Sequence, residues 1–309
     1  MNVLAVDVSK DELVCFDSQQ IVAIPNKAKA IHALLAKYPG WAIVLEPTST
    51  YHLELAERAH RQGRTVYLVN PRDLKHFRES RSFRAKTDAL DAQYLHEYVQ
   101  AHWAKMRPWV PMKVELRKLK DAIRRWFHLS QMRSKFAQVW HGQSGEDVDC
   151  VLDALEKLME ATEKEAVQLA KAVDAECYNR VLSAPGPGPF SACCFTFLLQ
   201  AKPFESADAI RAFVGLDLRV EDSGKKRGLR FITKRGDRIL RYAATCAAKG
   251  LLNSRYGKNV NEQLKAIGRK HPERLVIAAR KVIRTLFALE QNKTTFNPEK
   301  FTWRVDAKT

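Results

Sequence analysis

The order of strand-like and helix-like segments in the first hundred residues constrains the fold most. Three β-rich runs come first, and helices then alternate with further β-rich runs. Three consecutive strands followed by such alternation predict one mixed α/β sheet. We place its strands at residues 3–8, 12–16, 21–24, 41–45 and 65–69, and its helices at residues 27–37, 50–62 and from 88 to about 98.

Four acidic residues occupy special positions in this pattern. Asp7 interrupts the first β-rich run, where a carboxylate is disfavoured and needs a partner or a function. Glu46 directly follows the fourth predicted strand. Asp88 and Asp91 open the last helix on one face of it, with Thr87 as the predicted N-cap. Because ligands gather at the carboxyl ends of strands in such sheets, we expect the four acids to converge there.

Convergence of these acids would have a chemical consequence. Four carboxylates at one edge repel each other unless cations bind, and hard oxygen ligands suit magnesium or manganese. Two such ions about 3.5–4 Å apart are a known solution for phosphodiester chemistry. The alternative is that the acids are unrelated, and that Asp88 and Asp91 only favour the start of a helix through its dipole.

The charge balance points to a polyanionic partner. The chain has 52 Lys and Arg against 35 Asp and Glu, a net charge of +17, which favours nucleic acid. No amphipathic terminal helix rich in Lys and Trp supports an anionic membrane as partner, and a basic soluble protein without such a partner is the remaining alternative. A basic ladder leads towards the Asp88 helix and consists of Arg72, Lys75, Arg78, Arg81, Arg84 and Lys86.

The cysteines and the N-terminus indicate a cytoplasmic protein. The six cysteines form no C-x-x-C pair and have no histidine cluster beside them, which argues against a zinc site and fits buried thiols in a reducing compartment. The N-terminus lacks the basic region and long apolar core of a signal peptide. The longest uncharged run, residues 181–201, is broken by three prolines and two glycines and is too short to span a bilayer.

The middle of the chain is predicted to be helical. Pro108 and Pro111 mark a linker, and residues 114–140 form a basic helix. A heptad seam over residues 148–173 then predicts a helical hairpin or coiled coil. Because heptads do not fix the identity of the partner, the seam fits a contact between protomers and an intramolecular hairpin equally well. The seam consists of Val148, Leu152, Leu155, Met159, Thr162, Ala166, Leu169 and Val173.

The last third contains a serine in a cationic setting. A Pro/Gly-rich turn at residues 185–188 opens onto a helix, and further helices follow Gly236 and span about 273–289. Between them, residues 221–228 are predicted to form a flexible loop in which Ser223 precedes Lys225, Lys226 and Arg227. These cations can stabilise the charge of a phosphorane-like transition state. By sequence alone, a Ser-Gly turn also fits a plain turn.

Taken in order, these segments resemble the DEDD transposases of the one-ten insertion-sequence family, which include Piv/MooV-type DNA invertases. No single piece is specific, but their order and spacing cover most of the chain. The segments are residues 5–8, 46–51, 70–71, 86–92, 185–188, 213–216, 223–224 and 236–241. Three residues depart from the family pattern, namely Pro47, Ser49 and Pro187, and none of them is a chemical residue.

The resemblance implies a domain order and an active site. It implies a RuvC-like, ribonuclease-H-type domain at residues 1–107, a helical hairpin or coiled coil at 113–178, and a mainly helical transposase domain at 180–309. Asp7, Glu46, Asp88 and Asp91 match the metal-binding tetrad of the family, and Ser223 matches the serine that attacks DNA and holds it as a phosphoserine. The resemblance also implies double-stranded donor and target DNA, a bridge RNA as guide, and a homo-oligomer from dimer to tetramer with active sites shared between protomers.

The predicted function is therefore a metal-dependent, site-specific DNA recombinase in the bacterial cytoplasm. Ser223 would conserve the energy of the broken phosphodiester in a covalent bond, which allows rejoining without ATP. Two rivals remain, a RuvC-type structure-selective nuclease that uses water and a nucleic-acid-binding scaffold without activity. The residues predicted to contact phosphates are Arg84, Lys86, Lys225, Lys226 and Arg227.

Overall fold

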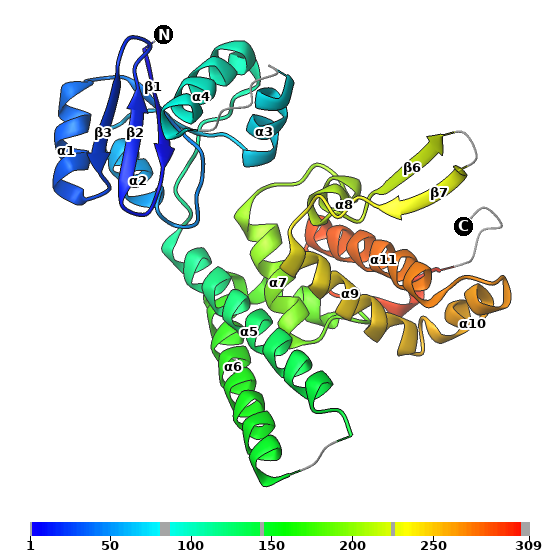
Figure 1. Cartoon of the computed structure of the whole chain (residues 1–309). Coiled ribbons are helices and arrows are strands. Elements are labelled where there is room, and N and C mark those ends of the chain that lie inside the picture. The colour runs from blue at the N-terminus through cyan, green and yellow to red at the C-terminus, as the bar shows by residue number, and fades with distance from the viewer. Residues whose placement is uncertain (1, 81–86, 143–144, 224–225, 304–309) are drawn as a thin grey trace. The chain divides into compact units, whose positions relative to one another are not determined.

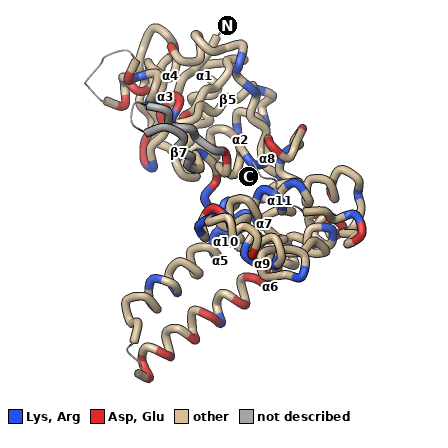
Figure 2. The backbone as a smooth tube through the Cα atoms, turned by 90° about the vertical axis from the view of Figure 1, so that its right-hand side faces the viewer, with Lys and Arg blue, Asp and Glu red and all other residues tan. Residues whose placement is uncertain are grey.

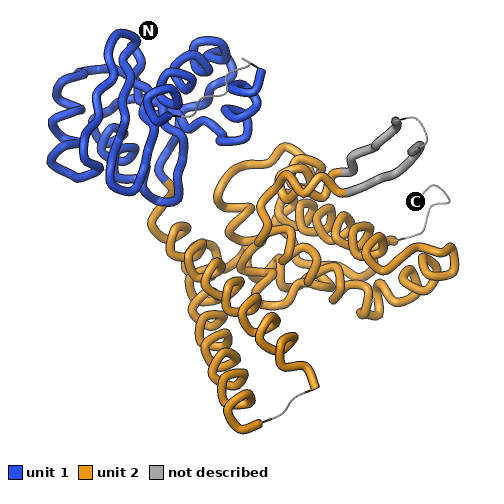
Figure 3. Tube along the Cα trace, in the orientation of Figure 1, with its two compact units in different colours: residues 1–111 blue, residues 112–309 orange. Residues whose placement is uncertain are grey.

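The chain folds into two compact units. The structure, a computed structural model, describes residues 2–80, 87–142, 145–223 and 226–303. The first unit comprises Met1–Pro111 and the second Met112–Thr309, as the two colours of Figure 3 show. The finer division into three domains, which the sequence suggests, stays a prediction.

Unit 1 is built on a five-stranded mixed sheet in the order β3-β2-β1-β4-β5 (Figure 1). β1 (Val3–Val8), β2 (Glu12–Phe16) and β3 (Ile21–Pro25) form an antiparallel meander. β4 (Ala42–Leu45) and β5 (Val66–Leu68) then run parallel to β1. The predicted mixed sheet is confirmed, because three strands joined by short turns are followed by two crossovers through helices.

Helices cover both faces of this sheet. Alternation along β1 turns Leu4, Val6 and Val8 towards α1 (Ala28–Lys37) and α2 (Leu53–Arg61), where they share one core cluster. Val3 and Ala5 face the other way, into a cluster with α3 (Pro71–Ser80) and α4 (Asp88–His102). Asp7 continues that second row, so the period of two places its carboxylate on the α4 face of the sheet. A short 3-10 helix, η1 (Trp103–Lys105), follows α4.

Unit 2 begins with a long helical hairpin. α5 (Val114–Val139) and α6 (Glu146–Ser183) pack along their lengths, and Arg125 and Arg133 of α5 bind Glu165 and Glu156 of α6. Figure 2 shows the acidic positions gathered along α6. The intramolecular hairpin is thus one of the two arrangements that the heptad seam predicts, and the seam residues are its half-buried or buried positions.

The rest of unit 2 is a helical bundle with a two-stranded ribbon. α7 (Pro189–Ala201) is buried on nearly all sides between α5, α6 and α9 (Arg238–Asn253), and α11 (His271–Asn292) packs on α9. Two shorter helices, α8 (Ala207–Val214) and α10 (Lys258–Ala266), complete the bundle together with the 3-10 helix η2 (Pro298–Lys300). Within the described ranges, no helix combines the length and the apolarity that crossing a bilayer requires.

The flexible loop predicted for residues 221–228 is wrong. The chain there forms antiparallel strands, β6 (Leu218–Ser223) and β7 (Lys226–Ile232), and residues 224–225 between them lie outside the described residues. The register pairs Val220 with Arg230 and Glu221 with Leu229, with an irregularity between Glu221 and Ser223. The charged and glycine-rich local sequence favours a loop, but backbone pairing with the β-prone end of β7 stabilises strands instead.

Candidate metal-binding active site

Two of the predicted acids lie side by side at the ends of parallel strands. β1 and β4 pair in register, with Val6 opposite Leu45. The next residue of each strand is Asp7 and Glu46, so the two carboxylates leave the sheet at the same edge. This is the carboxyl edge of both strands, where ligands gather in sheets with parallel strands.

The other two acids come from the start of α4. Thr87 caps this helix, and its Oγ1 accepts a hydrogen bond of 3.3 Å from the backbone N–H of Leu90, which confirms the predicted cap. Asp88 and Asp91 lie in the first turn, where the positive end of the helix dipole favours a carboxylate. Asp91 is 6% exposed, which is unusual for a carboxylate, whereas Asp88 is exposed. The helix packs on β1 and β2.

The electrostatics of Asp7 show that the four acids form one cluster. Burial and, after it, the negative charges of Asp91, Glu46 and Asp88 together raise the pKa of Asp7 from 3.8 to about 6, against the opposing effect of a hydrogen bond from the Val8 backbone N–H. All three charges act on the carboxyl group of Asp7, and such an effect requires that Glu46, Asp88 and Asp91 lie close to it. The structure therefore brings together Asp7, Glu46, Asp88 and Asp91.

Arg78 of α3 reaches into this cluster. Its guanidinium forms an ion pair with the Asp91 carboxylate and lies 3.5 Å, Nη2 to Oε2, from Glu46. The Arg78 side chain is only 22% exposed. Sequence analysis placed it in a ladder offered to a polyanion, and this is wrong for Arg78, because the side chain points to the acids instead. Its spacing from Arg72 and Lys75 is the helical i, i+3 pattern, which indicates a shared face but not which member turns inward.

The donor set fits a divalent hard cation. Four carboxylates supply oxygen ligands only, and the guanidinium of Arg78 offsets part of their charge. Two of the acids come from neighbouring strands and two from one helix turn, so the backbone sets the positions of all four. Such an arrangement can bind one or two divalent ions and present them to a phosphodiester.

Arg78→Met is expected to increase the stabilisation that a divalent ion gives to the protein. Without the guanidinium, Glu46 and Asp91 lose a partner, and the metal-free fold should lose about 2 kcal/mol of stability. An added ion then has more repulsion to relieve and no longer competes with the Arg78 guanidinium. Thermal unfolding with and without MgCl₂ or MnCl₂ measures this as a larger rise in Tm than in the wild type.

The control for this prediction is Lys75→Met. Lys75 lies on the same helix, its side chain is 71% exposed, and its ion pair is with Glu79. This variant should respond to the ions as the wild type does. A smaller rise in Tm for Arg78→Met than for Lys75→Met would mean that Arg78 helps to hold the ion and does not compete with it.

The remaining predicted site residues belong to other parts of the chain. Ser223 is the last residue of β6 in unit 2, paired in register with Lys226, and it is not part of the unit that carries the acids. Lys226 and Arg227 open β7. Arg84, Lys86 and Lys225 lie outside the described residues.

The ribbon that carries Ser223 has a tightly packed base. After α8, Gly215 adopts φ +74°, and its backbone lies directly against that of Gly236. A Cβ atom on Gly236 would come within 2.2 Å of the Phe213 carbonyl oxygen and 2.4 Å of the Gly215 nitrogen. Arg241 of α9 closes the contact, since its Nη1 donates to the carbonyl oxygens of Val214 (3.0 Å) and Gly236 (3.2 Å). The two ends of the ribbon are thereby fixed to the bundle.

Gly236→Ala is expected to destabilise unit 2 by about 2–3 kcal/mol, because the added methyl group meets backbone atoms that cannot rotate away. Scanning calorimetry of the full chain should show a lower Tm for the transition of unit 2. Gly188→Ala is the control, since a Cβ there meets nothing within 4 Å and its φ of −89° suits any residue. Equal Tm values for the two variants would contradict the close contact.

A second group of potential metal ligands is explained by the fold. Asp174, Cys177 and Glu290 have ligand atoms within 4.8 Å of one another. Asp174 interrupts α6 with non-helical angles, and its carboxylate accepts hydrogen bonds from the Cys177 backbone N–H (2.8 Å) and from Gln200 (3.0 Å). Glu290 accepts from Nε and Nη2 of Arg180, at 3.1 and 3.0 Å.

The thiol of this group is a poor metal ligand. Burial raises the pKa of Cys177 to about 12, so the thiol stays protonated at neutral pH. The two carboxylates already have donors in the helix kink and in Arg180. We interpret the group as a buried polar network that fixes the kink of α6 and joins it to α11.

Comparison with known families agrees with this geometry. Residues 4–142 match the family model of DEDD transposases of the IS110 type, described as Transposase. Residues 178–265 match the model described as Transposase IS116/IS110/IS902 family. None of the curated proteins matches the chain. The first match contains all four acids of the cluster, and the second contains the ribbon with Ser223.

Proposed function

The chain belongs to the IS110 family of DEDD transposases, enzymes that cleave and rejoin DNA, and from this premise we propose that it is a site-specific recombinase of an insertion sequence. The observation that carries the proposal is the convergence of Asp7, Glu46, Asp88 and Asp91 at one edge of the sheet of unit 1. The net charge of +17 supports a nucleic acid as substrate. The protein is expected to act on DNA in the bacterial cytoplasm.

Asp7, Glu46, Asp88 and Asp91 would hold magnesium or manganese. When bound, the ion would supply positive charge to the attacking and leaving oxygens of a phosphodiester. The strand ends and the first turn of α4 carry the carboxylates. A bound cation would relieve the repulsion between Asp7 and the other three acids. Lys and Arg residues that precede Asp88 in the sequence, with Arg84 and Lys86 as candidates, would guide the DNA backbone.

Ser223 would be the nucleophile. Its oxygen would form a bond to the phosphorus, its hydroxyl proton would pass to a base, and the bond from phosphorus to a sugar oxygen would break and release a hydroxyl end. The resulting phosphoserine would keep the bond energy, and attack by another sugar hydroxyl would reverse the step and rejoin the strands. Lys225, Lys226 and Arg227 follow Ser223 in the sequence and would neutralise charge on the phosphate.

A bridge RNA that pairs with the donor and the target DNA would determine which DNA sequences are recombined. The protein would then contact backbones and helix shape, as in other guided systems. Support for this comes from the family and from the excess of Lys and Arg over Asp and Glu.

A homo-oligomer, from dimer to tetramer, would share active sites between protomers. The outer side of the α5–α6 hairpin supports this, because it exposes large apolar side chains that a folded monomer leaves in water. Val151 and Leu158 are one heptad apart on α6 and are 40% and 55% exposed, and Met132 and Val139 on α5 are 57% and 77% exposed.

Leu158→Glu is expected to weaken association at least about tenfold, because a charge would be buried in an apolar contact between copies. Light scattering after size exclusion, over a range of protein concentrations, measures the shift. The exposed Lys157→Glu is the control, since it adds the same side chain beside the apolar row. An unchanged mass for Leu158→Glu would remove this face from the proposal.

One experiment separates the proposed recombinase from its rivals. The wild-type protein is incubated with labelled DNA from the junctions of its element, with RNA transcribed from the adjacent noncoding segment, and with MgCl₂ or EDTA. We expect a protein–DNA species that survives SDS and depends on magnesium, with the modified serine identified by mass spectrometry. Free cut ends without this species would indicate a RuvC-type nuclease, and binding without cutting would indicate a scaffold.

A further inference from the structure

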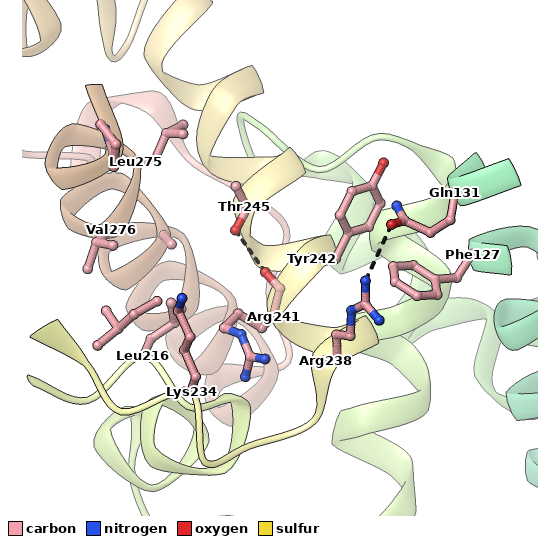
Figure 4. A pocket seen from close by; sticks show the side chains of 13 residues that line it. Phe127, Gln131, Leu216, Lys234, Arg238, Arg241, Tyr242, Thr245, Leu275 and Val276 are labelled. Carbon is pink, nitrogen blue, oxygen red and sulfur yellow. Dashed lines mark hydrogen bonds between the residues drawn. The ribbon is translucent and has the colours of Figure 1, made fainter. Parts of the chain in front are cut away.

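Unit 2 contains a pocket of about 450 Å³ that none of the predicted site residues lines. In Figure 4, Phe127 and Gln131 of α5 lie on one side of it and Leu275 and Val276 of α11 on the other, with α9 between them. Its volume lies in the range of pockets for small organic ligands, about 300–1,000 Å³. The pocket is therefore large enough for a single nucleotide unit but not for a folded element.

The lining combines apolar side chains with cations on both sides of the pocket. Lys234 and Arg238 are exposed cations on this lining, and among the thirteen residues that line the pocket in the described part of the chain there is no carboxylate. Nη2 of Arg238 donates a hydrogen bond of 3.4 Å to Oε1 of Gln131, and its Cζ lies 5.4 Å from the ring centroid of Phe127. The guanidinium therefore lies over the α5 side of the pocket. Asp237, the nearest acid in sequence, uses its carboxylate to cap α9, accepting from Ile239 and Leu240.

Aromatic rings lie beside Arg238. Tyr242 and Phe127 both line the pocket, with ring centroids 5.3 Å apart at an interplanar angle of 72°. Nucleic-acid bases stack on such side chains regardless of their sequence, while Lys and Arg hold the adjoining phosphate. An apolar wall on α11 faces these rings across the pocket, so a flat, weakly polar group can enter between them.

We propose that this pocket receives one unpaired nucleotide of a DNA or RNA strand, with its base between Tyr242 and Val276 and its phosphate on Lys234 and Arg238, while the buried ring of Phe127 supports Tyr242 from behind. The inference rests on the nucleic-acid substrate of the proposed function, but it assigns a separate site. Ile232, the last residue of β7, also lines the pocket. A nucleotide bound here would thus be held beside the base of the ribbon that carries Ser223.

The test measures how the full-length protein binds a labelled duplex with and without one unpaired thymidine. We expect the unpaired base to tighten binding about tenfold. The same bulge with an abasic sugar in place of thymidine should lose this gain, because it keeps the bend and the phosphate but not the base. DNA and RNA duplexes are compared in parallel. The type of duplex in which the unpaired base tightens binding shows whether the pocket takes a nucleotide of DNA or of RNA.

Two variants and one control locate the effect. Val276→Trp fills the pocket and should abolish the preference while leaving binding of the uninterrupted duplex unchanged. Lys234→Gln should weaken binding of the bulged duplex, whereas Lys249→Gln, an exposed cation on α9 that does not line the pocket, should not. With 5-iodouracil as the unpaired base, irradiation of the wild type should cross-link to the peptide that contains Tyr242 or the peptide that contains Val276.

Equal affinity for thymidine and abasic bulges in both the DNA and the RNA arm would overturn the inference, and so would a cross-link mapped away from these peptides. The result does not depend on the wider proposal. Binding of the uninterrupted duplex reports whether the protein contacts nucleic acid at all, so a lost preference with intact duplex binding rejects the pocket alone.

Discussion

Asp7→Asn is expected to reduce DNA strand cleavage about a thousandfold or more and, in the absence of divalent ions, to stabilise the fold at neutral pH. The asparagine keeps the shape of the side chain but removes one of the four negative charges that would hold the ion. A loss of about 4 kcal/mol of transition-state stabilisation corresponds to this factor.

The gain in stability follows from the raised pKa of Asp7. Burial, together with Asp91, Glu46 and Asp88, raises that pKa from 3.8 to about 6, so the folded state holds its proton more tightly than the unfolded chain. The contribution of Asp7 to stability is therefore full below pH 4 and is lost as the pH rises through 6. The shift corresponds to about 3 kcal/mol, and solvent screening of this half-buried group leaves about 1–2 kcal/mol.

Unfolding of both proteins in EDTA, from pH 4 to pH 8, checks the second half of this prediction. The Tm of Asp7→Asn should exceed that of the wild type above pH 6, and the difference should vanish near pH 4. Asp11→Asn, an exposed aspartate in the turn after β1, is the control and should change neither activity nor the pH profile. Retained cleavage in Asp7→Asn would falsify the assignment of the acid cluster as the catalytic site.

Ser223→Ala is expected to abolish the covalent protein–DNA species while leaving duplex binding within about twofold of the wild type. Alanine removes the only atom that would bond to phosphorus, so we expect a loss of at least about a thousandfold, close to the background of the assay. Ser206→Ala, an exposed serine that caps α8 in the same unit, should still form the species. Unimpaired cutting by Ser223→Ala would favour the water-using nuclease.

Co-expression of Asp7→Asn with Ser223→Ala extends this prediction. Each variant lacks one half of the chemistry, and sharing of active sites would let the serine of one protomer act with the acids of another. Mixed oligomers should then recover part of the activity that neither variant has alone. Absence of recovery in oligomers confirmed to be mixed would mean that each protomer works by itself.

Sequence reasoning located the acid cluster because its signals are local. The strand-embedded Asp7, the position of Glu46 at a strand end and the Thr87 cap are visible in short segments, and the parallel register of β1 and β4 then joins them. The predicted strands of unit 1 agree with those observed to within two residues at each end.

The signals that sequence reasoning missed are those that depend on tertiary contacts. Arg78 has the same spacing as its exposed neighbours, and only the packing of α3 on α4 turns it inward. The β6–β7 ribbon pairs two charged segments whose local propensity is low. The pocket of unit 2 collects residues from α5, α9 and α11, of which α5 is more than a hundred positions from the other two, and no short-range pattern predicts such a set.

The break in α6 at Asp174 has a consequence for assembly. The part of α6 before this point belongs to the hairpin and the part after it to the bundle, and two hydrogen bonds to the Asp174 carboxylate hold the junction. If copies meet through the hairpin, the angle between their bundles is decided at this junction, far from the surfaces that touch. A substitution of Asp174 would then change the arrangement of the bundles in the oligomer without changing the contact between the hairpins.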